Sequence, residues 1–123
     1  MSILISFDID GTLEMGDPPG IVTMQMVRRA RDLGYVIGSC SDRTLSMQQQ
    51  LWEQQDIAVD FMILKQNLGD LKARFDHAQS YYHIGDTLTD EFYALRAGFY
   101  FVWSEAEAIA AADAAFSRVF VGL

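Results

Sequence analysis

The sequence predicts an α/β protein in which a central, parallel five-stranded sheet lies between two layers of helices, a three-layer Rossmann-like arrangement. Two observations carry this prediction. Short apolar runs alternate with stretches of helical periodicity along the chain, which is typical of a parallel sheet with helices on both faces. Half of the 123 residues are hydrophobic, enough to build one core, so we expect a single domain over residues 1–123.

Five apolar runs predict the strands. The first, SILISF at residues 2–7, stops directly before Asp8 and has the composition of a buried strand. The other runs are residues 35–40, 60–64, 80–84 and 99–103. Polar residues follow three of the strands, at Asp8, Ser41 and Asp86. Since ligands of such sheets bind beyond the carboxyl ends of the strands, these residues mark the expected site.

Helical spacing and stop signals fill the intervals between the strands. A loop at residues 14–20 precedes a predicted helix over residues 21–33, which Gly34 ends. Thr44 is placed to cap a second helix.

Two further helices are predicted near Asp70 and over residues 90–97. Ser104 and Glu107 match a capping box that would open a final alanine-rich helix.

Charge and composition narrow the function classes. The net charge of -8, from 17 acidic and 9 basic residues, should repel nucleic acid overall, although a few basic residues can still hold one phosphate. The single cysteine excludes an intrachain disulfide. No apolar run approaches the ~20 residues that span a bilayer, and no basic leader precedes the first strand. We therefore expect a cytoplasmic protein that does not contact membranes.

Two groups of acidic residues predict a metal site. Asp8 and Asp10 lie one residue apart where a buried strand ends, and buried charges need a partner or a metal. Asp86 and Asp90 follow the fourth strand in the same way. Carboxylates combined with phosphate oxygens are the ligands that Mg²⁺ prefers. The alternatives are a solvated turn for the first pair and an acidic helix start, favoured by the helix dipole, for the second.

Phosphate binding would need hydroxyl and cationic groups. Ser41 and the backbone N–H groups after it could hold phosphate oxygens, with Arg43 as a charged contact. The chain has only two lysines, Lys65 at the end of the third strand and Lys72 in the next helix. Each of these residues could equally be an ordinary cap or a solvated surface residue.

Taken together, these motifs resemble the haloacid dehalogenase (HAD) superfamily of phosphatases over essentially the whole chain. DIDGTL at residues 8–13 reproduces the first motif of the family, and GDTLTD at residues 85–90 matches the fourth. Ser41 fits the second motif, with Ser39 as the alternative.

A lysine that opens the helix before the fourth strand is the third motif of the family. Lys72 fits this topology better, and Lys65 is the alternative.

The resemblance implies a HAD-like fold, a Mg²⁺ cofactor and a set of roles. Asp8 would be the nucleophile and a metal ligand, forming an aspartyl phosphate. Asp10 would protonate the leaving group, activate water and offer its backbone carbonyl to the metal. Asp86 would complete the metal ligands, and Asp90 would act through water or by positioning.

By the same resemblance, the phosphoryl group would be held by Ser41, Lys72 or Lys65, Thr12 and Arg43. The short loop at residues 14–20 leaves no room for the cap domain of many relatives. The chain would therefore belong to the capless subclass, which acts on large phosphorylated substrates or closes its site by homo-oligomerisation.

Other functions remain as alternatives. A receiver domain of bacterial signalling has a similar length and acidic pocket, but its phosphorylated aspartate ends the third strand and its lysine ends the fifth. A non-catalytic binding module of the same family is the other alternative. Within the phosphatases, the substrate stays open: it could be a small phosphomonoester, a phosphoprotein or a nucleic-acid end. The last is considered because residues 64–70 loosely resemble polynucleotide phosphatases.

Overall fold

The computed structural model describes residues 2–120 and contains a five-stranded, all-parallel sheet with the strand order β3-β2-β1-β4-β5. The strands are β1 (Leu4–Phe7), β2 (Val36–Ser41), β3 (Phe61–Leu64), β4 (Tyr81–Gly85) and β5 (Tyr100–Trp103). The predicted fold class is confirmed. This is the strand order of a Rossmann sheet, whereas receiver domains follow the order 2-1-3-4-5. The topology therefore gives no support to the receiver alternative.

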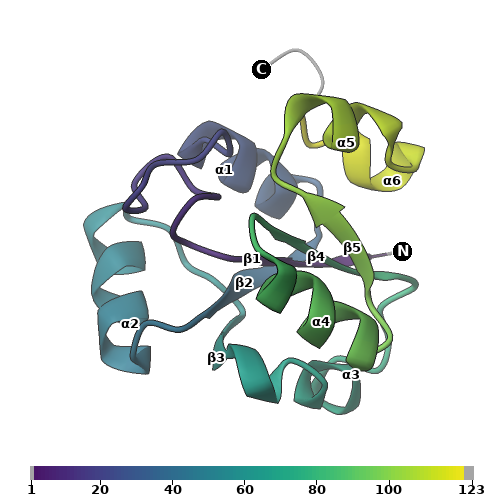
Figure 1. Ribbon diagram of the computed structural model, residues 1–123, viewed down its shortest axis with the longest axis horizontal. Helices are drawn as coiled ribbons and strands as arrows, with labels where there is room; N and C mark the ends of the chain where they lie inside the picture. The colour runs from purple at the N-terminus through teal and green to yellow at the C-terminus, as the bar shows by residue number, and fades with distance from the viewer. Residues whose placement is uncertain (1, 121–123) are drawn as a thin grey trace.

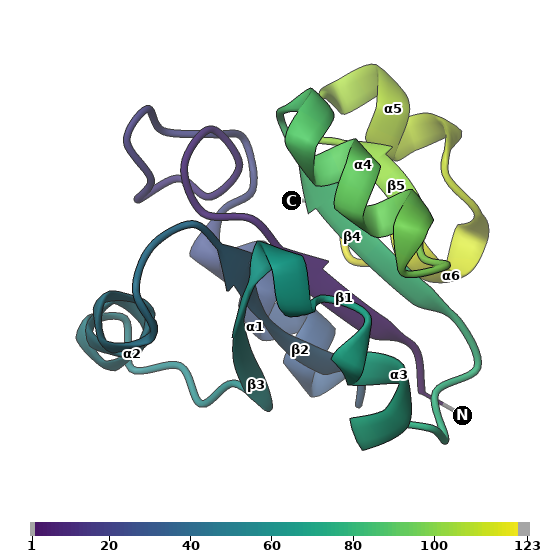
Figure 2. The ribbon, with the colours of Figure 1, turned by 60° about the horizontal axis from the view of Figure 1, so that its bottom comes forward.

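Helices cover both faces of the sheet (Figure 1). They are α1 (Met24–Asp32), α2 (Leu45–Gln54), the 3₁₀ helix η1 (Lys65–Asn67), α3 (Asp70–Arg74), α4 (Leu88–Arg96), α5 (Ala106–Ala111) and α6 (Ala114–Ser117). The core on one face packs side chains of α1, α2, α5 and α6 against the sheet. The other core packs side chains of α3 and α4, together with Leu68 after η1. Figure 2 shows β1 between β2 and β4, and Figure 1 shows β5 between α4 and α5.

The position of β1 explains where the functional residues meet. All four residues of β1 are fully enclosed, as expected for the central strand of a covered parallel sheet. Phe7 lies opposite Ser39 of β2 and Ile84 of β4, so the carboxyl ends of the three strands are level. Asp8 continues this pairing, because its N–H donates to the carbonyl of Ile84 at 3.0 Å. Residues that follow β1, β2 and β4 therefore share one edge of the sheet.

The first helix begins later than its periodicity predicts. Thr23 caps it, with its hydroxyl accepting from the N–H of Met26, whereas Val22 forms a β-bridge with Leu13. Val22 is buried at this bridge, so its apolar side chain belongs to the bridge and not to the helix. This bridge closes the base of the loop between β1 and α1.

The predicted capping box at the C-terminal helix is wrong. Glu105 occupies the N-cap of α5 without a side-chain cap, and the helical stretch is split because Asp113 caps α6 separately. The Ser104 hydroxyl instead donates to the carbonyl of Gly11 at 3.0 Å. Ser104 thus ties the end of β5 to the turn after β1.

The described residues contain no inserted cap domain, since the residues between β1 and α1 form only a loop and those between β2 and α3 form α2, β3 and η1. Nor does any helix in residues 2–120 have the length and apolar character needed to cross a bilayer.

Candidate active site

A polar cavity of about 230 Å³ opens at the carboxyl edge of the sheet. Its walls are formed by Asp8, Asp10, Pro18, Ser41, Asp42, Lys65, Asp86 and Thr87. These residues come from the end of β2 and from the segments that follow β1, β2, β3 and β4, where a parallel sheet places its ligands. Most of the residues expected from the sequence therefore share one cavity.

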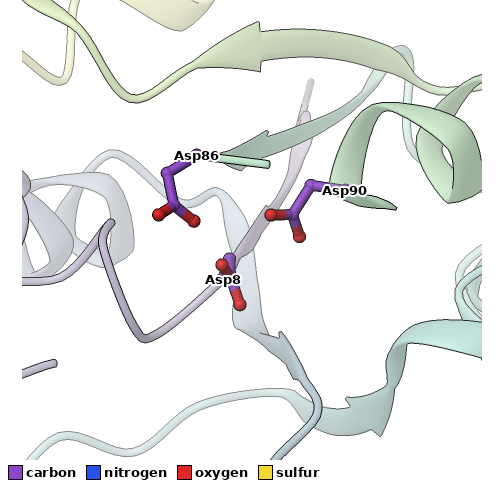
Figure 3. A group of neighbouring side chains, drawn as sticks. All are labelled: Asp8, Asp86 and Asp90. Atoms are coloured by element: carbon purple, nitrogen blue, oxygen red, sulfur yellow. The ribbon is translucent and has the colours of Figure 1, made fainter. Parts of the chain in front are cut away.

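Three carboxylates converge in or beside this cavity, as Figure 3 shows. Asp8, Asp86 and Asp90 each place one oxygen within 4.8 Å of the others. Two glycines make room for them. Gly11 has a positive φ of 77°, and a β-carbon there would collide with the carboxylate of Asp86. A β-carbon on Gly85 would collide with Asp90.

The chemistry of this cluster fits a hard divalent cation. All of its side-chain donors are carboxylate oxygens, the type that Mg²⁺ takes together with water and phosphate. Burial, followed by the nearby charge of Asp90, raises the pKa of Asp8 from its usual 3.8 to about 9, in spite of the ammonium of Lys65. A cation between Asp8 and Asp86 would offset this cost and keep Asp8 ionised.

Asp90 is already occupied by protein donors. Its Oδ1 lies 3.0 Å from Nε2 of His83 and 3.2 Å from Nζ of Lys65. Its Oδ2 accepts from the N–H and the hydroxyl of Thr87, at 3.2 and 2.8 Å. A carboxylate has about four lone-pair sites, so these donors fill it. Asp90 is therefore better suited to positioning its neighbours than to binding the metal directly, whereas Asp8 and exposed Asp86 have capacity left.

The same contacts keep the carboxyl group of Asp90 ionised. Burial alone would raise its pKa, but the hydrogen bond from His83, the charges of His83 and Lys65 and the hydroxyl of Thr87 lower it below the usual value. The pKa values of Asp8 and Asp90 are thus shifted in opposite directions, although the two carboxyl groups are neighbours. Asp90 remains the anion of the pair, and it anchors the lysine that reaches Asp8.

Lys65 is the lysine of this cavity. Its side chain is 6% exposed, and Nζ lies 3.7 Å from Oδ1 of Asp8 and 3.5 Å from Oδ2 of Asp42. Burial lowers the pKa of Lys65, but the surrounding carboxylates outweigh burial and raise it, so the ammonium stays charged.

The preference for Lys72 is therefore corrected. Lys72 points to the opposite end of the sheet, where Nζ lies 5.2 Å from the ring centre of Tyr81, the first residue of β4. The family motif predicts a lysine at the opening of the helix before the fourth strand, but a 3₁₀ turn begins directly at the end of β3 and carries Lys65 into the cavity.

Asp10 is paired with Arg43 in a two-bonded arrangement. Nη2 of Arg43 lies 2.6 Å from Oδ1 of Asp10, and Nε lies 3.2 Å from Oδ2. The N–H of Asp17 also donates to Oδ1 at 2.8 Å. The hydrogen bonds from Arg43 lower the pKa of Asp10, against the effect of its partial burial. Asp10 thus joins the loop at residues 14–20 to the segment after β2.

Ser41, and not Ser39, faces the cavity. The oxygen of Ser41 accepts the N–H of Arg43 at 3.0 Å, which leaves its hydrogen free to donate. Ser39 is fully enclosed, donates to Oε1 of Gln48 at 2.6 Å and accepts from Nε1 of Trp52 at 3.0 Å. Ser39 therefore belongs to the packing of α2 on the sheet.

Thr12 does not line the cavity, although the resemblance places it with the phosphate-binding residues. Its side chain is fully enclosed, and its hydroxyl has no hydrogen-bond partner among the described residues. The structure thus separates Thr12 from the other predicted site residues.

His83, a buried residue of β4, is a further polar residue of this region that is not among those predicted from the sequence. Its Nδ1 is 3.0 Å from the hydroxyl of Ser6 on β1. Because an ionised Asp90 only accepts hydrogen bonds, Nε2 must carry the hydrogen that it shares with Asp90. One signal was available, since a histidine within an otherwise apolar buried strand requires polar partners.

Comparisons with known proteins do not assign this chain to a family. No protein-family model matches the sequence, and no curated protein matches it either.

Proposed function

We propose that this protein is a Mg²⁺-dependent phosphatase of the HAD type, which hydrolyses a phosphomonoester through an aspartyl phosphate on Asp8. One observation carries the proposal. Asp8 directly follows the central strand and lines the polar cavity, with the ammonium of Lys65 3.7 Å from Oδ1 and the carboxylate of Asp86 beside it. Once a bound cation offsets the burial of Asp8, its ionised oxygen next to this fixed positive charge is the arrangement that phosphoryl transfer to a carboxylate requires.

The first step transfers the phosphoryl group to the protein. An oxygen of Asp8 attacks phosphorus, the bond from phosphorus to the leaving oxygen breaks, and that oxygen takes a proton from Asp10. Lys65 and the hydroxyl of Ser41 are placed to hold the phosphoryl oxygens, because both line the cavity.

The second step restores the carboxylate. Asp10, now ionised, removes a proton from a water molecule that attacks phosphorus of the aspartyl phosphate. The bond from phosphorus to the Asp8 oxygen breaks, and inorganic phosphate leaves. The same side chain thus serves as acid and then as base.

Asp8, Asp86 and the backbone carbonyl of Asp10 would hold Mg²⁺, which supplies charge neutralisation for the phosphate and the nucleophile when bound. Arg43 has to release Asp10 before that carboxyl can carry a proton, since their hydrogen bonds favour the ionised form. The incoming phosphate is an anion that can take the guanidinium in exchange.

Hydrolysis of para-nitrophenyl phosphate, with and without Mg²⁺, tests the proposal. We expect turnover that EDTA abolishes and that Asp8→Asn reduces to background. Asp76→Asn is the matched control, because Asp76 is exposed and the substitution removes the same charge away from the cavity.

Absence of turnover calls for a second measurement, the thermal stabilisation of the protein by Mg²⁺ with beryllium fluoride, which imitates a phosphoryl group on aspartate. Stabilisation without turnover indicates a binding module. If neither turnover nor stabilisation is found, the phosphatase proposal is wrong.

A further inference from the structure

A second hollow of about 190 Å³ adjoins the candidate active site. It lies between the loop at residues 14–20 and α2, and it is lined by Met15, Arg43, Met47, Gln50, Leu51, Gln54 and Gln55. Met47, Gln50, Leu51 and Gln54 follow the i, i+3, i+4, i+7 spacing, so one face of α2 forms a wall. We call this hollow the α2 groove.

The α2 groove meets the catalytic cavity at one ion pair. Asp10 lines the cavity, Arg43 lines the groove, and their side chains are joined at 2.6 and 3.2 Å. In the proposed reaction, Asp10 gives its proton to the leaving oxygen. The group attached to that oxygen therefore lies on the side of Asp10 from which the α2 groove begins.

The walls of the groove carry no free charge. Its one ionised side chain is Arg43, which Asp10 neutralises, and the polar residues are glutamines whose amides both donate and accept. In the proposed reaction the phosphate takes the place of Asp10 as the partner of Arg43, so the lining side chains still offer an anionic leaving group no unpaired cation, and the chain as a whole carries a net charge of -8. The lining thus selects against a carboxylate or a second phosphate on the leaving group.

The apolar part of the lining suits a flat ring. Buried Leu51 and the thioethers of Met15 and Met47 offer apolar and polarisable contacts, and sulfur packs favourably against aromatic rings. The volume is below the ~300–1,000 Å³ of pockets for drug-sized ligands, so it admits about one ring system. The far end is fixed, because Arg28 donates to the carbonyl of Gln55 at 2.9 Å.

We propose that the α2 groove is the leaving-group subsite, and that the substrate is a phosphomonoester of a neutral, planar, ring-sized group with hydrogen-bonding atoms at its rim. This inference rests on the proposed phosphatase function. It adds the specificity-determining residues Met47, Gln50 and Gln54, which are absent from the family motifs.

The test compares two substrates that differ in one charge. These are 4-carbamoylphenyl phosphate, with a neutral leaving group, and 4-carboxyphenyl phosphate, with an anionic one. Acetyl phosphate, whose leaving group has only two carbons, reports the chemistry without the groove. We expect Gln50→Lys to raise the ratio of kcat/KM for the carboxylate over that for the carboxamide about two- to five-fold, the range that partly exposed ion pairs give.

Gln49→Lys is the matched control. Gln49 precedes Gln50 on α2, is exposed and does not line the groove. Its replacement by lysine adds the same charge as Gln50→Lys. It should leave both the substrate ratio and acetyl phosphate hydrolysis unchanged. The change should lie in KM more than in kcat, because a subsite contact is made equally in the ground and transition states. Equal ratios in the two lysine variants would overturn the subsite.

Failure of the phosphatase proposal is distinguishable from failure of the subsite. If none of the three phosphates is hydrolysed with Mg²⁺, binding of the two aryl phosphates is measured by calorimetry. Preference for the carboxamide in the wild type, reversed by Gln50→Lys but kept by Gln49→Lys, would support the groove even without catalysis. No preference, or no binding of either compound, would reject it.

Discussion

The ammonium nitrogen of Lys65 lies 3.7 Å from Oδ1 of Asp8, within a cavity that leaves both side chains almost completely enclosed. This pair places positive charge directly beside the proposed nucleophile. In a partly desolvated site such a charge interacts more strongly than it would in water.

Replacement of the two lysines by methionine should therefore have opposite outcomes. Lys65→Met is expected to lower kcat/KM for para-nitrophenyl phosphate at least ~100-fold, the scale of losing one electrostatic contact to the transition state. Lys72→Met should retain activity, since Lys72 contacts the Tyr81 ring at the other end of the sheet. Steady-state kinetics checks both variants, and a greater loss in Lys72→Met would show that the lysine assignment is wrong.

His83 should act on catalysis through Asp90. His83→Leu removes one donor from Oδ1 of Asp90 and breaks the contact between the imidazole and the hydroxyl of Ser6. We expect a loss of about 1–3 kcal/mol in the free energy of unfolding, the cost of an unsatisfied buried polar group. We also expect a fall in kcat of about tenfold or more with little change in KM, because Lys65 loses its fixed anchor.

His83→Gln serves as the conservative comparison, since its amide can still donate to Asp90. Urea unfolding and steady-state kinetics on both variants separate the roles. If both variants lose stability equally and keep a wild-type kcat, His83 has only a structural role.

The raised pKa of Asp8 predicts how stability depends on pH without metal. Because its pKa is about 9 in the folded protein and 3.8 ordinarily, the folded state keeps a proton that the unfolded chain releases. The free energy of unfolding should therefore decrease as the pH rises from about 4 towards 9. Thermal unfolding in EDTA checks this slope, and Mg²⁺ should reduce it.

Asp8→Asn should be more stable than the wild type at pH 8 in EDTA and should lack most of this slope. Asp76→Asn removes the same charge at an exposed position and should keep this slope. A parallel pH dependence for the wild type and Asp8→Asn would contradict the environment described for Asp8.

The pairing of Asp10 with Arg43 predicts a pH dependence of the free energy of unfolding that has the opposite sign. The hydrogen bonds from Arg43 lower the pKa of Asp10, so their contribution to stability is present above the ordinary pKa. That contribution is lost as the pH falls through the folded-state pKa. In Arg43→Gln, the Asp10 carboxyl should titrate at a higher pH, which carbon-detected NMR can follow.

Arg43→Lys gives an intermediate expectation, because it keeps the charge but not the planar two-bonded contact. An unchanged Asp10 titration in Arg43→Gln would mean that the ion pair does not persist in solution.

Local pattern was enough to predict the sheet and most of the cavity. Asp8, Asp86 and Ser41 each follow an apolar run, and the rule that parallel strands end at one edge brings them together. The roles that depend on side-chain direction could not be read in the same way. Whether Lys65 or Lys72 reaches the cavity depends on a 3₁₀ turn directly after β3, which leaves no clear periodic signal.

Long-range hydrogen bonds account for the other differences. Ser104 and Glu107 satisfy the spacing of a capping box, yet the hydroxyl of Ser104 bonds Gly11, 93 positions away. His83 likewise finds Ser6 across 77 positions, and only the pairing of β1 with β4 brings the two together. Tertiary contacts of this kind override a local preference and leave no mark in sequence spacing.

The central position of β1 also has a consequence for biosynthesis. Its two sheet partners, β2 and β4, follow it in the chain, and β4 is separated from it by three helices, a 3₁₀ turn and two other strands. On the ribosome, Asp8 and Asp10 emerge well before Asp86 and Asp90, so a nascent chain that stops at the end of β4 has only two of these four carboxylates. Truncated translation products should therefore be inert towards metal and phosphate, and the cluster assembles only when nearly the whole domain has been made.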